Sequence, residues 1–283
     1  MKKKIEKKNI KNNEQKEKKN IFQDKLIIVL IILLVILSLI ILGITFANRN
    51  NLDTESKLVT ELHNYFNTDD LSNCDGLFTY AEKKVEYSDI DSETRLCLAY
   101  QKAEIKDAET GTMKATKKKN TCTEDGMTFR VTEDTTECNY TKIEKSIIDN
   151  SYKKLYGKEV ENNESFKIDN LNICYLKDDY YYCGLSEIFT YTLGNESIIY
   201  RVMEKAVEKS SDIIIYDYFA KLINDTCYKA YTTINVNEKC TEKYKNNKDI
   251  NYKFMKKYAT KYKHIFRQKE DGTYYWVSSE PVK

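Results

Sequence analysis

Histidine, tryptophan, proline and glycine are scarce in this chain. Its 283 residues include two His (His63 and His264), one Trp (Trp276), one Pro (Pro281) and eight Gly. Two histidines leave little for a His-based metal site, and the zinc-protease motif HExxH does not occur. Lys, Asn, Ile and Tyr are abundant instead. Because this skew is typical of an AT-rich genome, the Lys and Tyr content by itself carries little functional information.

The sequence also lacks the short motifs of several large protein classes. There is no GxSxG, so no nucleophile elbow of the α/β-hydrolase kind is expected. There is no GxxxxGK[ST] and no GxGxxG, the glycine-rich loops that hold phosphates. The absence of CxxC argues against a thioredoxin-like redox site and a zinc ribbon. The sequence therefore assigns no catalytic, cofactor-binding or metal-binding residue, and no cofactor is expected.

One apolar run interrupts an otherwise polar chain. Residues 26–47, LIIVLIILLVILSLIILGITFA, contain no charged side chain over 22 residues. As a helix they would cover about 33 Å, against a hydrocarbon core of about 30 Å. The run predicts an N-terminal transmembrane helix that tethers the chain to a lipid bilayer. The apolar core of a cleaved signal peptide is shorter, about 7–15 residues, so we expect an uncleaved signal-anchor.

The charges on the two sides of this run are unequal. Residues 1–25 carry ten Lys and four acidic residues, a net charge of +6, and have no apolar periodicity. They predict a disordered cytoplasmic tail, because lysine clusters stay on the cytoplasmic side. Residues 49–283 hold the remaining 36 basic and 40 acidic residues, a net charge of −4. This part is expected to be extracytoplasmic at the cell membrane, and its charge gives no reason to expect nucleic-acid binding.

All eight cysteines follow the apolar run. An even number of cysteines on the side expected to be extracytoplasmic indicates disulfides. A hairpin turning at Asp178-Asp179 would place Cys174 opposite Cys183, with Cα atoms about 4.5 Å apart. The other pairings rest on nearest neighbours alone. The candidate disulfides are Cys74–Cys97, Cys122–Cys138, Cys174–Cys183 and Cys227–Cys240.

A linker over 48–53 leads into residues 54–283, which are expected to form an α+β domain. In its helical part, 54–157, apolar spacing predicts helices over 54–66, from about 88–91 onward, and over 141–156. Ser88 or Asp91 is a candidate N-cap for the second helix, and Gly157 is a natural C-cap. His63 lies at the edge of the first apolar stripe, where a packing or surface role is expected. Residues 110–120 are expected to be a polar loop.

The part from 166 to 283 is expected to be mainly β. Alternation and turn residues predict a hairpin over 172–183, two long strands over 197–208 and 213–222, and a strand over 228–234. A last helix is expected over 250–261 and a closing hairpin over 262–278. His264 alternates with apolar residues, so it is expected to be a sheet residue.

The order of elements indicates helices packed on one face of a curved antiparallel sheet behind a transmembrane helix. This order loosely resembles NTF2-like and cystatin-like folds, which implies a cone-shaped pocket but transfers no functional residue. No motif identifies a family.

Three functions are compatible with the sequence. The first is a non-enzymatic, membrane-anchored protein whose disulfide-stapled ectodomain binds an envelope component or a membrane protein. The second is a sensory or ligand-binding domain with a pocket between sheet and helices. The third is a cell-envelope hydrolase or transpeptidase, for which Cys227, His264 and Arg267 are present, although their order and surroundings do not match a sortase-type enzyme. A disulfide between Cys227 and Cys240 is the simpler expectation.

Overall fold

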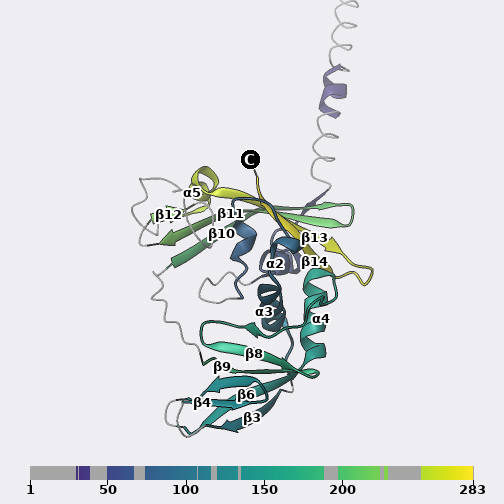
Figure 1. Ribbon diagram of the computed structural model, residues 1–283. Coiled ribbons are helices and arrows are strands. Elements are labelled where there is room, and N and C mark those ends of the chain that lie inside the picture. The colour runs from purple at the N-terminus through teal and green to yellow at the C-terminus, as the bar shows by residue number, and fades with distance from the viewer. Residues whose placement is uncertain are drawn as a thin grey trace, which may run out of the picture. The chain divides into compact units, whose positions relative to one another are not determined.

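The computed structural model describes residues 30, 32–38, 50–66, 74–106, 108–115, 120–132, 135–187, 197–223, 226–228 and 250–282 (Figure 1). The chain divides into two compact units, Met1–Asn51 and Leu52–Lys283. The predicted cytoplasmic tail, residues 1–25, lies outside the described residues.

The expected transmembrane helix is not found. In the first unit residues 30 and 32–38 are helical, and their large apolar side chains are about half exposed. Over the whole described part of the chain, no helix combines the length and the apolar character that a membrane crossing requires.

The second unit contains a large antiparallel sheet, here called sheet A. Its strand order is β1-β10-β11-β13-β14-β2, and β12 pairs with β11. Most of its pairing involves β10 (Ser197–Lys209), β11 (Asp212–Ile223), β13 (Thr260–Gln268) and β14 (Tyr274–Pro281). The other strands are short: β1 (Asn51–Leu52), β2 (Val85–Glu86) and β12 (Thr226–Tyr228). The two long hairpins predicted from alternation are confirmed.

A second antiparallel sheet, sheet B, has the order β3-β6-β9-β8-β7. Its strands are β3 (Glu109–Lys114), β6 (Glu137–Glu144), β7 (Phe166–Lys167), β8 (Asn172–Lys177) and β9 (Tyr180–Leu185). A small hairpin, β4 (Thr121–Glu124) and β5 (Met127–Arg130), turns at Asp125-Gly126, both with positive φ. In sheet B, Tyr181 faces the protein core and is fully buried, while Tyr180 and Tyr182 on the other face are half-buried.

Three helices pack between the two sheets (Figure 1). They are α2 (Lys57–His63), α3 (Ser92–Lys102) and α4 (Lys145–Tyr156). The Asp91 side chain accepts from the Thr94 N–H at 2.8 Å and caps α3, and Gly157 ends α4 in the left-handed conformation. Short 3-10 helices η1 (Leu77–Tyr80) and η2 (Tyr87–Asp89) precede α3. A further helix, α5 (Tyr252–Tyr258), packs on the opposite face of sheet A.

The expected fold class is therefore wrong. Helices were expected to cover one face of a single curved sheet, but the described chain is mostly antiparallel β-sheet with its helices enclosed between two sheets. The second sheet is completed by β3 and β6, which occupy residues predicted to be a polar loop and the start of a helix. Strand pairing satisfies the backbone of these polar residues, although they show little apolar alternation. The NTF2-like or cystatin-like resemblance is withdrawn with the fold class.

Three predicted disulfides are present. Cys74–Cys97, Cys122–Cys138 and Cys174–Cys183 have Cα separations of 5.0, 6.0 and 4.0 Å. Cys174 pairs with Cys183 across β8 and β9, in the register expected for a turn at Asp178-Asp179. Cys227 is also disulfide-bonded, and its expected partner, Cys240, lies outside the described residues. The disulfides thus join Cys74, just before residues 77–80, to α3, the small β4–β5 hairpin to β6, and β8 to β9.

Candidate functional site

A buried carboxylate lies in the middle of sheet A. The side chains of Ile213, Ile215 and Phe219 alternate on the core face of β11, and Asp217 occupies a position in the same series. Its side chain has no exposed surface. A buried ionised carboxylate is costly unless hydrogen bonds and charges compensate it. The surroundings of Asp217 are therefore the first place to look for chemistry.

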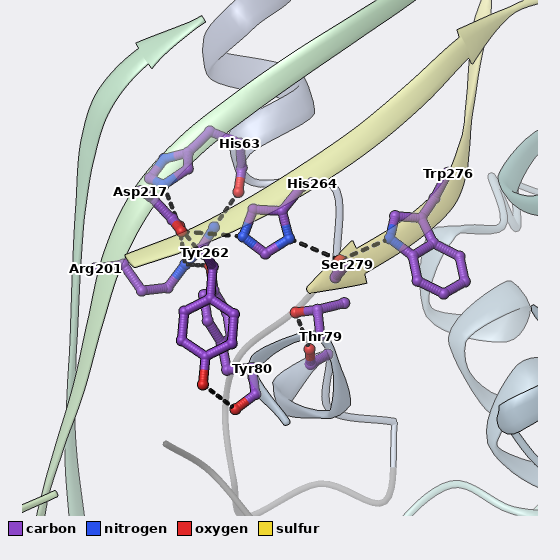
Figure 2. Close-up of polar contacts among 10 residues, drawn as sticks. His63, Thr79, Tyr80, Arg201, Asp217, Tyr262, His264, Trp276 and Ser279 are labelled. Atoms are coloured by element: carbon purple, nitrogen blue, oxygen red, sulfur yellow. Dashed lines mark hydrogen bonds and ion pairs between the residues drawn. The ribbon is translucent and has the colours of Figure 1, made fainter. Parts of the chain in front are cut away.

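Both histidines of the chain converge on this carboxylate (Figure 2). His63, the last residue of α2, places Nε2 3.1 Å from Oδ2 of Asp217. His264, on β13 beside β11, places Nε2 3.0 Å from Oδ1. The Tyr80 hydroxyl, from η1, donates to Oδ2 at 2.6 Å. Side chains from α2, from the segment 77–80 and from the distant strand β13 thus meet at one acidic group.

Arg201 adds a positive charge to the cluster. It lies on β10, with Nε 3.9 Å from Oδ2 of Asp217, and its Nε–H donates to the Tyr80 hydroxyl at 2.6 Å. A second guanidinium N–H donates to the carbonyl oxygen of His63. Burial opposes ionisation of Asp217, but His264, His63 and Arg201 outweigh it and hold the pKa of the carboxyl well below its usual range. Burial, and secondarily the Asp217 charge, raises the pKa of Tyr80.

The network continues from His264 into β14. His264 Nδ1 lies 2.7 Å from Ser279 Oγ, and the Trp276 indole N–H donates to the same oxygen at 2.9 Å. In the tautomer that carries its proton on Nε2, His264 donates to Asp217, and its Nδ1 accepts the Ser279 hydroxyl proton. The result is a continuous path from Trp276 through Ser279 and His264 to Asp217 (Figure 2).

The aligned Asp217, His264 and Ser279 combine the residue types of a hydrolytic triad. A nucleophilic serine must reach substrate, but Ser279 is 1% exposed and its Oγ also accepts from Trp276. The cavity beside the cluster has a volume of about 20 Å³, with His63, Tyr80, Arg201, His264 and Trp276 in its wall. This space is sufficient for a single water molecule and too small for an organic substrate. The arrangement can hold charge and order the core, but it offers no open reaction centre.

In comparisons with protein-family models, curated proteins and solved structures, nothing matches this chain. Its function is therefore argued from geometry.

The structure places the predicted site residues in structural roles. In the described part of the chain every cysteine is disulfide-bonded, so none is available as a nucleophile or a metal ligand. The thiol-transpeptidase hypothesis fails on this point, because Cys227 is bonded. His264 binds Asp217, and Arg267 forms an ion pair with Asp212 at 2.9 Å. Within the same described residues, no group of three or more His, Cys, Asp or Glu side chains could hold a metal ion.

Sequence reasoning missed the centre of the cluster. Asp217 carries a detectable signal, since it falls at a core-facing position in the alternating strand 213–219. An acidic residue there demands buried partners, and a chain with two histidines offers few candidates. Tyr80 and Arg201 carry no such signal, because their meeting with Asp217 depends on how the sheet and η1 pack.

Proposed function

We propose that this chain is a non-catalytic binding domain that works outside the cytoplasm at the cell membrane. One observation carries the proposal: the groups capable of catalysis are used to build the fold. Both histidines are bound to Asp217, Ser279 is covered, and the described cysteines are disulfide-bonded. What is left for function is the surface.

The compartment is supported by the disulfides. The three disulfides fit an oxidised, extracytoplasmic domain, because the cytosol keeps thiols reduced. The basic tail and the apolar run 26–47 support the same direction, with the tail inside and the second unit outside. We propose that the apolar run attaches the chain to the bilayer and that the partner is a component of the envelope or its membrane.

The sensory alternative gains no support from the cavity beside Asp217. A small-molecule site needs roughly 300–1,000 Å³ with a few convergent polar groups. The cavity between sheet A, α2 and η1 has the polar groups, but its volume of about 20 Å³ is far below that range.

Thiol labelling on intact cells tests the compartment. A membrane-impermeant maleimide is added before and after reduction with an impermeant phosphine, and Asn12→Cys in the tail serves as the internal control. We expect the native cysteines to react only after reduction, and the thiol introduced in the tail to react only after the membrane is permeabilised. Native cysteines that react only in permeabilised cells would place the domain inside and reject the proposal.

A further inference from the structure

One half of the outer face of sheet A is not covered by any described helix or strand. The outer face is the one opposite α2, α3 and α4. At one end α5 packs on it, over Tyr218, Ala220 and Leu222 of β11. Toward the other end of the strands, Val207, Ile214 and Ile265 form a cross-strand row in which each residue is partly exposed. None of these three belongs to a buried apolar cluster.

The next row along the strands is Lys205, Tyr216, Lys263 and Glu280, in register across four strands. The Lys205 Nζ lies 5.0 Å from the centre of the Tyr216 ring. Aliphatic, tyrosine and lysine side chains therefore alternate across one surface. This is the composition of interfacial segments, in which Tyr lies at headgroup depth and the Lys stem stays apolar while its ammonium reaches the headgroups.

The outer face is strongly basic. Its acidic side chains in the described part of the chain are each paired: Glu204 with Lys261, Glu280 with Lys263, Asp212 with Arg267, and Glu86 with Lys84. The remaining lysines have no carboxylate partner within the described residues. They are Lys205, Lys209, Lys253, Lys256 and Lys257. Among the described residues, nine basic and four acidic side chains give this face a net charge of +5, whereas residues 49–283 together carry −4.

Helix α5 adds further tyrosine and lysine side chains to the outer face. Tyr252 is 45% exposed, and Lys256 Nζ lies 5.9 Å from the centre of its ring. Lys257 Nζ lies 4.9 Å from the ring of Tyr258. The helix thus carries aromatic rings and ammonium groups toward solvent while Met255 anchors it to the sheet.

We propose that the outer face of sheet A, with α5, docks on a bilayer surface that contains anionic phospholipids. Concentrated positive charge is complementary to anionic headgroups, and the row of Val207, Ile214 and Ile265 can enter the boundary between headgroups and acyl chains. A second copy of the chain is a poor occupant, because two faces of charge +5 repel each other.

This inference rests on the proposed attachment through residues 26–47. Only residues 48–51 separate that run from Leu52, where the second unit begins, at the edge of sheet A in β1. At about 3.5 Å per residue, a bilayer that holds Ala47 lies within about 17 Å of Leu52. The tether therefore keeps the sheet at a high effective concentration near lipid, so even weak docking is populated.

Hydrogen exchange of the full chain in lipid nanodiscs tests the docking. The discs contain phosphatidylcholine alone or phosphatidylcholine mixed with phosphatidylglycerol. We expect amides at Ser210–Ser211 and in α5 to exchange at least about fivefold more slowly in the anionic discs, since each lysine near the surface contributes to the attraction. High salt should remove the difference, because it screens exposed charges. Amides of β8 and β9 serve as an internal reference.

Two variants make the test specific. The change K205Q/K253Q/K256Q/K257Q should abolish the lipid dependence. The matched change K57Q/K83Q/K154Q/K167Q, at exposed lysines elsewhere, should preserve it. Equal exchange in both lipids, or equal loss in both variants, overturns the docking. Protection found in native envelope membranes but in neither lipid mixture assigns the face to a protein and overturns it as well. Failure of the chain to associate with any disc rejects the attachment itself, whereas the compartment is tested separately by thiol labelling.

Discussion

His63 and His264 place their Nε2 atoms against different oxygens of the same buried carboxylate, that of Asp217. One comes from the end of α2 and the other from β13, so the carboxylate joins a helix to the sheet beneath it. With Tyr80 and Arg201 it also joins η1 and β10. The cluster is therefore the point at which the N-terminal elements are fixed to sheet A.

Removing the charge of Asp217 should destabilise the fold. Asp217→Asn replaces one acceptor oxygen with an NH₂ group that faces the donors of His63, His264 or Tyr80. We expect the free energy of unfolding to fall by about 3–5 kcal/mol. Urea denaturation followed by the fluorescence of Trp276 measures it. Glu270→Gln, at an exposed turn, should change stability by less than about 0.5 kcal/mol. Similar values for the two variants would contradict the role assigned to Asp217.

As the pH falls, the free energy of unfolding should decrease more steeply in the wild-type protein than in the Asp217→Asn variant. The pKa of Asp217 is depressed in the folded state, so its contribution is complete above the unfolded value of about 3.9. It is lost as the pH falls below that value toward the folded pKa. We expect the free energy of unfolding to fall steeply below about pH 4 in the wild type, with a shallower slope in the variant. Parallel slopes in a urea series from neutral to acidic pH would argue against this linkage.

Ser279 should contribute to the stability of the fold and should not act as a catalytic nucleophile. Ser279→Ala leaves the Trp276 N–H and His264 Nδ1 without their buried partner. We expect a loss of about 1–3 kcal/mol and a shift in the emission of Trp276, the sole tryptophan. Ser211→Ala, at an exposed turn, is the control. Unchanged stability together with loss of a hydrolytic activity would revive the triad hypothesis.

Two glycines with positive φ distinguish the cost of backbone strain from the cost of a steric clash with a neighbouring side chain. Gly126 has φ +82 with open space around the position of a Cβ, whereas at Gly157, φ +66, a Cβ would lie 2.9 Å from the Tyr275 ring. We expect Gly126→Ala to cost about 1 kcal/mol, since Ala adopts positive φ reluctantly. Gly157→Ala should cost clearly more, because the ring of Tyr275 must move. Thermal denaturation of both variants gives the difference, and equal costs would mean that the ring yields freely.

The Cys122–Cys138 disulfide should stabilise mainly the β4–β5 hairpin and leave sheet A unaffected. It closes a separation of 16 residues and ties β4 to β6. The double change C122S/C138S should lower the free energy of unfolding by about 3 kcal/mol on the chain-entropy model. In native-state hydrogen exchange, the β4–β5 amides should lose protection while those of β11 and β13 keep theirs. Equal loss in sheet A would show that the hairpin is coupled to the whole domain.

The sequence predicted local features better than their assembly. The C-cap at Gly157 and the register that pairs Cys174 with Cys183 depend on neighbours in sequence, and both are confirmed. Of the two candidate N-caps, Ser88 and Asp91, the structure uses Asp91. The strand over Glu109–Lys114 was missed because a polar edge strand has only Met113 to bury. Without it, the second sheet and the enclosed layer of helices were not visible.

The site was missed for a related reason. The prediction that His264 is a sheet residue was correct, and His63 was expected to have a packing or surface role, yet neither statement brings the two together. Their common partner follows from the order of strands in sheet A, in which β11 lies between β10 and β13. That order is a long-range property, and alternation of apolar residues does not encode it.

The strand order also dictates when this protein can fold. Sheet A pairs β2, from the first third of the chain, with β14 near its end, and β13 supplies His264 to the Asp217 cluster. A chain made only up to residue 250 contains β10 and β11 but lacks β13 and β14, the strands that join β11 to β2 in sheet A. Contacts of such long sequence separation form slowly and late. Sheet A and the Asp217 cluster therefore cannot be completed until the last strands of the unit Leu52–Lys283 have been synthesised.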